Sequence, residues 1–146
     1  MRLTTFSDYS LRVLIYLGTT PDRLATIDQV AEAYGISANH LMKVVHHLAR
    51  LGCIETVRGK GGGMRLARAP AEINVGEIVR ASEDSLALVE CFDGGGGDCR
   101  IARSCVLKQA LAEALQAFLK VLDGYTLADL LAPARPLARV LLAARS

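Results

Sequence analysis

The sequence contains no tryptophan, and phenylalanine and tyrosine together make its aromatic content only 5%. Because 51% of its 146 residues are nonetheless apolar, the core must be built from aliphatic side chains. Leucine, alanine and valine predominate among them, and these residues favour helices that pack on helices. A chain of this length forms one compact unit, or one domain with an added element. The composition therefore predicts a mainly α protein.

The chain also lacks a large excess of either charge and a long apolar run. Its net charge of +2 excludes a general coat for nucleic acid, so any DNA contact must come from local basic clusters. No window reaches about 18 uncharged apolar residues, which argues against a membrane span. Asp8 and Arg12 interrupt the first apolar stretch, which argues against a signal peptide. We therefore expect a cytoplasmic protein with no membrane partner and with reduced cysteines.

Residues 1–82 have the pattern of a winged helix-turn-helix. Periodicity and caps predict helices over roughly residues 7–19, 27–34 and 38–51, and the turn YGIS joins the last two. Apolar and polar residues then alternate in CIETV and MRLAR around the turn RGKGGG, which predicts a β-hairpin wing with a glycine-rich tip. One further helix, capped by Asn74, follows over residues 75–82. A hairpin directly after a helix-turn-helix indicates a DNA-binding domain.

The third predicted helix is the one expected to read DNA, because the N-terminal residues of such a helix reach the bases of the major groove. Asparagine can pair with adenine, and lysine with guanine or phosphate. The hairpin carries four basic residues and no acidic one between residues 57 and 68, and its glycines allow close approach to phosphates. A solvated helix face and an ordinary hairpin are the alternatives. The predicted DNA contacts are Ser37, Asn39, His40, Lys43, Arg58, Lys60, Gly61 and Arg65.

A long C-terminal helix predicted over residues 105–123 is expected to join two copies of the chain. Its apolar stripe is too wide for one core face of an exposed helix, although burial in a monomer core would give the same pattern. A nearly neutral protomer with one reading helix would bind weakly, so we expect a homodimer on palindromic double-stranded operator DNA. A short last helix ends near residue 131, and residues 132–146 are expected to be a tail that is poorly ordered at its start. The stripe contains Leu107, Leu111, Leu115, Phe118 and Leu122.

Three of the four cysteines lie in the stretch CFDGGGGDCRIARSC, with spacings of seven and five residues. Thiolates select zinc, copper(I) or iron-sulfur clusters. The spacings are too long for the knuckle of a structural zinc site, whereas a longer loop can wrap a cluster. Residues 83–104 are therefore predicted to be a cluster-binding loop, and we call this loop together with Cys105 the cysteine segment. Its proposed ligands are Cys91, Cys99 and Cys105, and glycines 94–97 are suited to the wrapping. Cys53 is interpreted as a small buried residue of the hairpin.

Three thiolates leave a fourth ligand to be found. No histidine lies near the cysteine segment, because all three are at positions 40, 46 and 47. Nearby candidates are Glu90, Asp93, Asp98 and Lys108, of which lysine is a poor ligand because its amine is protonated at neutral pH. Composition and spacing do not choose among the carboxylates.

The stretches FSDYSLRVLIYL, ANHLMKVVHHL, VRGKGGGMRLAR and LKQALAEALQAFLKVLDGYTLADL, together with the three cysteines, resemble a known family. They are similar, over about residues 1–131, to the nitric-oxide-sensing members of the winged-helix iron-sulfur regulators that include IscR and RirA. The resemblance implies a homodimeric transcriptional repressor with a cluster on Cys91, Cys99 and Cys105, of the 4Fe-4S rather than the 2Fe-2S type. It also implies a fourth ligand from the first helix of the partner protomer, at the position of Asp8. An ordinary acidic residue near a helix N-terminus is the alternative for Asp8.

The resemblance implies that nitric oxide attacks the cluster and thereby releases the operator. IscR-like proteins place a histidine where this chain has Lys108, which argues against a site of that type. RirA-like proteins share the cysteine spacing, so an iron-status or redox signal is the alternative. A zinc-stabilised DNA-binding protein without a sensor function is another. No set of catalytic residues and no phosphate-binding loop between a strand and a helix is present, so we expect no enzyme activity.

Overall fold

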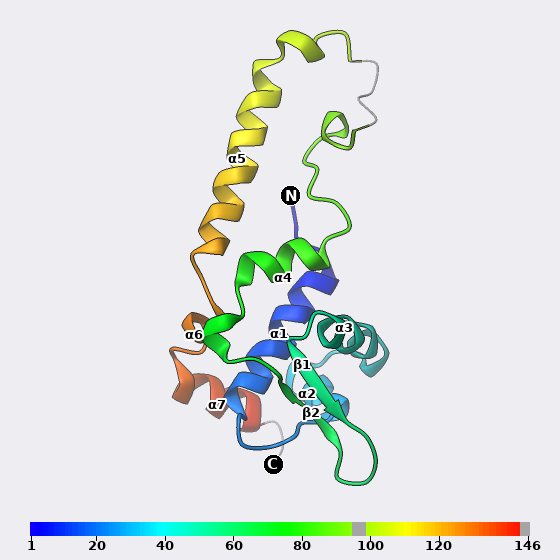
Figure 1. Ribbon diagram of the computed structural model, residues 1–146, viewed down its shortest axis with the longest axis vertical. Helices are drawn as coiled ribbons and strands as arrows, with labels where there is room; N and C mark the ends of the chain where they lie inside the picture. The colour runs from blue at the N-terminus through cyan, green and yellow to red at the C-terminus, as the bar shows by residue number, and fades with distance from the viewer. Residues whose placement is uncertain (95–98, 144–146) are drawn as a thin grey trace.

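The computed structural model describes residues 1–94 and 99–143 and has a winged-helix domain from which one long helix extends (Figure 1). The α-helices are α1 (Thr5–Thr19), α2 (Ile27–Tyr34), α3 (Ala38–Arg50), α4 (Val75–Ser82), α5 (Val106–Asp123), α6 (Leu127–Leu130) and α7 (Ala134–Ala143). The strands are β1 (Ile54–Val57) and β2 (Gly63–Leu66), and the short 3-10 turns are η1 (Pro70–Glu72), η2 (Glu90–Phe92) and η3 (Ala102–Ser104). The mainly α fold with a hairpin wing is as predicted.

Helix α1 lies at the centre of the domain. It packs against α3, α4, α6, α7 and β2, and its residues Val13, Leu14, Tyr16 and Leu17 are buried. The core around it is aliphatic, as the shortage of aromatic residues predicts. None of the helices in the described residues is both long and apolar enough to cross a lipid bilayer.

The helix-turn-helix forms from local signals in the sequence. Thr26 and Gln29 make a reciprocal capping box at the start of α2, with hydrogen bonds of 3.1 and 3.2 Å. Gly35 ends α2 with φ +65°, a left-handed conformation that a glycine adopts without steric cost. Ser37 occupies the cap position of α3 as expected, but its side chain makes no capping hydrogen bond. The four residues of α3 predicted to face the core are buried, namely Leu41, Val44, Val45 and Leu48.

The wing is held against the helix-turn-helix by backbone hydrogen bonds. Strands β1 and β2 are antiparallel, with Val57 opposite Gly63 at the tip. Ala25, just before α2, exchanges two hydrogen bonds with Met64 of β2, of 2.9 and 2.8 Å. A Cβ atom on Gly62 would lie 2.2 Å from the carbonyl oxygen of Val57, so the tip has no room for a side chain there. The position of the wing relative to α2 is therefore fixed.

Glu83 joins the end of α4 to the beginning of α1. Its carboxylate accepts hydrogen bonds from the backbone N–H of Thr4 at 2.8 Å, from the Thr4 hydroxyl at 3.0 Å, and from the Ser7 hydroxyl. Partial burial raises the pKa of Glu83, but these hydrogen bonds outweigh it and leave the pKa below its ordinary value of 4.5. The start of the cysteine segment is thus tied to the N-terminal turn of α1.

Beyond Glu83 the chain leaves the domain and returns through α5 (Figure 1). Leu119 is the buried residue of α5, and the other residues of the helix are half-buried or exposed. Val106, Leu107 and Val121 are 75%, 64% and 61% exposed. Of the predicted apolar stripe, Leu107 is exposed and the other four residues are half-buried, so the stripe is only partly covered in a single chain.

Helix α7 replaces the start of the tail expected from the sequence. It packs on α1 and α2, and its Leu141 belongs to the buried core. Pro136 lies in the first turn of α7, where a backbone N–H has no helical partner and a proline is tolerated. The two prolines therefore mark the beginning of a helix rather than a disordered stretch.

The hydroxyl of Tyr16 gives a test of the core. Tyr16 is fully buried, and its hydroxyl has no hydrogen-bond partner within the part of the chain that the structure describes. Tyr16→Phe should therefore leave the free energy of unfolding unchanged or raise it by up to about 1 kcal/mol, because it removes an unsatisfied polar group.

The matched control is Tyr34→Phe. Burial raises the pKa of Tyr34 to about 12, and its hydroxyl donates a hydrogen bond of 3.0 Å to the carbonyl of Arg12. This variant should lose about 1 kcal/mol in urea denaturation. If Tyr16→Phe loses as much as Tyr34→Phe, the Tyr16 hydroxyl has a partner and the account of this core is wrong.

Glu83→Gln should lower the free energy of unfolding by about 1 kcal/mol at pH 7, because a neutral amide is a weaker acceptor for Thr4 and Ser7. A lowered pKa in the folded state means that the carboxylate stabilises the fold above pH 4.5 and loses this effect as the pH falls further. The difference between wild type and variant should therefore shrink as the pH falls below 4.5 in urea titrations. Asp84→Asn, at the next, exposed position, is the control. A difference that persists undiminished at low pH would contradict the assignment.

Candidate DNA interface and metal centre

The first turns of α3 present an exposed polar surface. Ser37, Asn39, His40 and Lys43 are all exposed, whereas the core residues of the same helix point inward. Met42 lies among them and is 57% exposed, although the sequence prediction left it out. Met42 is an apolar residue at a position that the periodicity of α3 leaves exposed. This could have indicated a DNA contact, because an apolar side chain can contact a thymine methyl group. This surface has the composition of a major-groove reading face.

His47, by contrast, turns toward the interior. Its ring lies 5.2 Å from the ring of Phe6 in an edge-to-face arrangement, and its Nε2 atom is 3.5 Å from the Ser82 hydroxyl. Burial and the neighbouring Arg50 lower the pKa of His47, so the ring is neutral at pH 7. His47 therefore contributes to the contact between α3, α1 and α4 and not to the reading face.

The wing carries basic side chains in two different environments. Arg58 and Lys60 are exposed at the tip, and Gly61 between β1 and β2 has φ +76°. Arg65 lies on β2, where its guanidinium donates to the carboxylate of Glu55 directly across the hairpin. Glu55 lies just before residues 57–68, the stretch that contains no acidic residue, so the sequence did not predict this ion pair. A DNA contact by Arg65 stays a prediction, and it would compete with Glu55.

Asp8 lies on the exposed side of α1, with 48% of its side chain accessible. Its carboxylate is 3.0 Å from the guanidinium of Arg12, one helical turn away. Arg12 also lies 5.9 Å from the ring centre of Tyr9 and 5.7 Å from that of Tyr34. The Tyr9 ring in turn is 6.4 Å from His40 on the reading face. The expected fourth ligand is thus close to the reading helix and exposed to another chain.

The three thiols of the predicted metal site are free, and the segment between α4 and α5 that carries them extends away from the winged-helix domain (Figure 1). Cys91 is part of η2, Cys99 is exposed, and Cys105 caps α5 by accepting a hydrogen bond of 3.3 Å from the backbone N–H of Lys108. A thiolate at a helix N-terminus is stabilised by the helix dipole. Asp98 and glycines 95–97 lie outside the described residues.

Among the described residues, the carboxylates near the thiols do not complete a site in one chain. Asp93 accepts a hydrogen bond of 2.8 Å from Ser85, and Glu90 is exposed. Within residues 1–94 and 99–143, no three histidine, cysteine, aspartate or glutamate side chains lie close enough to hold a metal ion. The donor chemistry of three free thiols, one of them at a helix N-terminus, nevertheless fits an iron-sulfur cluster. Cys53 is separate from them and buried, as predicted.

Comparisons with known proteins identify relatives of this chain. The family model described as "Rrf2: Iron-dependent Transcriptional regulator" matches residues 3–133. The chain is 55% identical over 131 residues to the HTH-type transcriptional regulator NsrR of Bacillus subtilis (strain 168), an alignment that covers 89% of this chain and 90% of that protein.

Two solved structures have the same fold. IscR from T. potens superposes with a TM-score of 0.74 at 28% identity and covers 92% of this chain and 88% of its own. CymR (YrzC), the global cysteine regulator of B. subtilis, superposes with a TM-score of 0.72 at 26% identity and covers 89% of this chain and 95% of its own. The predicted winged helix and the family resemblance are both confirmed. The chain belongs to the Rrf2 family of transcriptional regulators.

Proposed function

We propose that the chain is a homodimeric transcriptional repressor that releases its operator when nitric oxide reacts with an iron-sulfur cluster bound to Cys91, Cys99 and Cys105. The observation that carries the proposal is the placement of three free thiols between the winged-helix domain and a helix whose apolar face is only partly covered. Similarity to the transcriptional regulator NsrR of B. subtilis supports the proposal, and the nitric-oxide signal is what the resemblance of the sequence to the nitric-oxide-sensing members of this family implies. No catalytic activity is part of the proposal, and the protein acts on DNA in the cytoplasm.

The DNA-binding half of the proposal uses residues 1–82. Helix α3 enters the major groove with Asn39, His40 and Lys43 toward the bases, and Ser37 at its start contacts the backbone. The wing tip, with Arg58, Lys60 and Gly61, lies against phosphates. Two copies joined through residues 105–131 place their reading helices about 34–36 Å apart, one turn of DNA, which requires a palindromic operator. Helix α7, in residues 132–146, packs on α1.

The sensing half uses the cysteine segment and the partner protomer. A bound cluster, which we assign as 4Fe-4S rather than 2Fe-2S, supplies iron that reacts with nitric oxide. Asp8 of the partner is proposed as the fourth ligand, since it is exposed on α1 and no carboxylate of the described part of the same chain joins the thiols. A carboxylate binds iron less firmly than a thiolate, so Asp8 is the ligand that exchanges most readily. When it is not a ligand, Arg12 holds it at 3.0 Å.

An iron-status or redox regulator is the second candidate. It is favoured by the description of the matching family model as iron-dependent. The two candidates differ in what releases the operator from the cluster-loaded protein. Removal of iron by a chelator should act on an iron-status regulator even without nitric oxide, whereas a nitric-oxide sensor should respond to nitric oxide while its iron is still bound.

Cys99→Ala should abolish the visible absorption of the anaerobically purified protein, because it removes an exposed thiol proposed as a ligand. It should also weaken binding to a palindromic duplex, selected by wild type from a random library, by at least about tenfold, as expected of a two-state switch biased by one site.

Cys53→Ala is the matched control, because this thiol is buried in the core away from the cysteine segment. It should retain both the absorption and the affinity for the duplex. Equal cluster content in the two variants would contradict the ligand assignment. A colourless wild-type protein that holds zinc would contradict the sensing function itself.

A further inference from the structure

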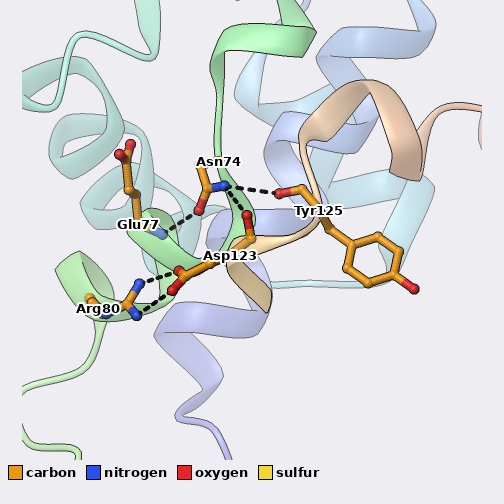
Figure 2. Close-up of polar contacts among 5 residues, drawn as sticks. All are labelled: Asn74, Glu77, Arg80, Asp123 and Tyr125. Carbon is orange, nitrogen blue, oxygen red and sulfur yellow. Dashed lines mark hydrogen bonds and ion pairs between the residues drawn. The ribbon is translucent and has the colours of Figure 1, made fainter. Parts of the chain in front are cut away.

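The base of α5 is attached to α4 by a polar clasp, which consists of Asn74, Arg80 and Asp123 (Figure 2). The two terminal nitrogens of Arg80 donate to the two carboxylate oxygens of Asp123, at 2.5 and 2.8 Å. This bidentate geometry fixes the direction of both side chains as well as the distance between them. The last residue of α5 is thereby oriented on the surface of α4.

Asn74 holds the same residue through its backbone. Its side-chain amide nitrogen donates to the carbonyl oxygens of Asp123, at 2.8 Å, and Tyr125, at 3.3 Å. Its side-chain oxygen accepts from the backbone N–H of Glu77 at 3.1 Å and so caps α4 (Figure 2). One amide therefore forms the start of α4 and grips the end of α5 at once.

Gly76 shows how closely the clasp fits on α4. A Cβ atom at this position would lie 2.0 Å from Oδ1 of Asp123 and 3.0 Å from Nη1 of Arg80. The ion pair thus rests directly on the backbone of α4, and any larger residue at position 76 would displace it. The backbone of Gly76 is that of an ordinary helix, so a glycine is needed here for space and not for an unusual backbone conformation.

The clasp contributes direction more than stability. The side chains of Arg80 and Asp123 are 39% and 42% exposed, and an exposed ion pair adds little to the free energy of folding. Among the residues of α5, Leu119 alone is buried, and its other apolar residues are half-buried or exposed. With 18 residues, α5 is about 27 Å long, so a tilt of about 10° at its base moves its far end by about 5 Å.

We propose that Asn74, Arg80 and Asp123 are positioning residues that set the angle between α5 and the winged-helix domain, and with it the spacing of the two reading helices on the operator. This inference rests on the proposed function, in which α5 joins two copies and α3 reads DNA. The clasp joins α5, the proposed dimer helix, to α4 of the DNA-binding domain (Figure 1). The angle between these two helices would therefore set how far apart the two copies of α3 lie along the DNA.

The test compares three duplexes: the palindrome that wild type selects from a random library, and the same palindrome with one base pair added or removed at its centre. Wild type should bind the two altered duplexes at least about tenfold more weakly, because each insertion or deletion shifts and rotates one half-site. Arg80→Met and Asp123→Asn should reduce this discrimination to less than about threefold. The double variant should be no worse than either single variant, because both changes break one interaction.

Arg80→Lys keeps the charge but not the bidentate geometry, and it should give an intermediate discrimination. Lys120→Met, in the same turn of α5, is the matched control and should discriminate as wild type does. Light scattering should show dimers for every variant, and thermal unfolding should show that each is folded.

Two results would overturn the clasp. One is wild-type discrimination in Arg80→Met and Asp123→Asn. The other is a loss of affinity by the same factor on all three duplexes, which would indicate a merely structural role. A wild-type protein that binds all three duplexes equally would overturn the palindromic dimer of the proposed function, and the clasp with it.

Discussion

The winged-helix domain is organised around the apolar side of α1, where Val13, Leu14 and Tyr16 are completely buried. Helices α3, α4, α6 and α7 and strand β2 all pack on this one helix, so the burial of its apolar side chains holds the predicted reading helix, the wing and α4 in one frame. The opposite side of α1 is polar and carries Asp8 and Arg12. A helix that is rigidly packed on one side and exposed on the other can pass a change at its surface to the reading helix.

Helix α4 connects this frame to the rest of the chain through two sets of polar contacts. Glu83, directly after α4, binds the first turn of α1, whereas Asn74 at the N-terminus of α4 and Arg80 in its last turn hold the last residue of α5. The cysteine segment leaves from one end of α4, and the chain comes back to the other through α5 (Figure 1). The thiols are therefore part of a closed path that begins and ends on the DNA-binding domain. In the proposed repressor, a reaction at the thiols changes the positions of the two reading helices through this path.

Local signals made much of the fold predictable from the sequence. Asn74 caps α4 where expected, Gly35 ends α2 in the left-handed conformation, and Cys53 is buried in the hairpin. Helix α7 was missed because its prolines suggested a break, and because the packing of Leu141 in the core is not visible in the local sequence. Contacts between residues distant in sequence, such as Glu83 with Thr4 and Ser7, follow from packing that no local pattern encodes.

The candidate sites were predictable to different degrees. The exposed polar surface of α3 follows directly from helical periodicity, so its residues lie where the sequence placed them. The environment of Arg65 depends on the register of the hairpin, which brings Glu55 opposite to it. The three thiols are in one segment as expected, but a ligand from a second chain cannot be located in one copy. The central claim, that the state of the thiols controls DNA binding, is tested most directly by recording cluster absorbance and operator binding in one anaerobic sample as nitric oxide is added. The account predicts that both signals change together over the same range of nitric oxide. Loss of the cluster absorbance with the operator still fully bound would contradict it.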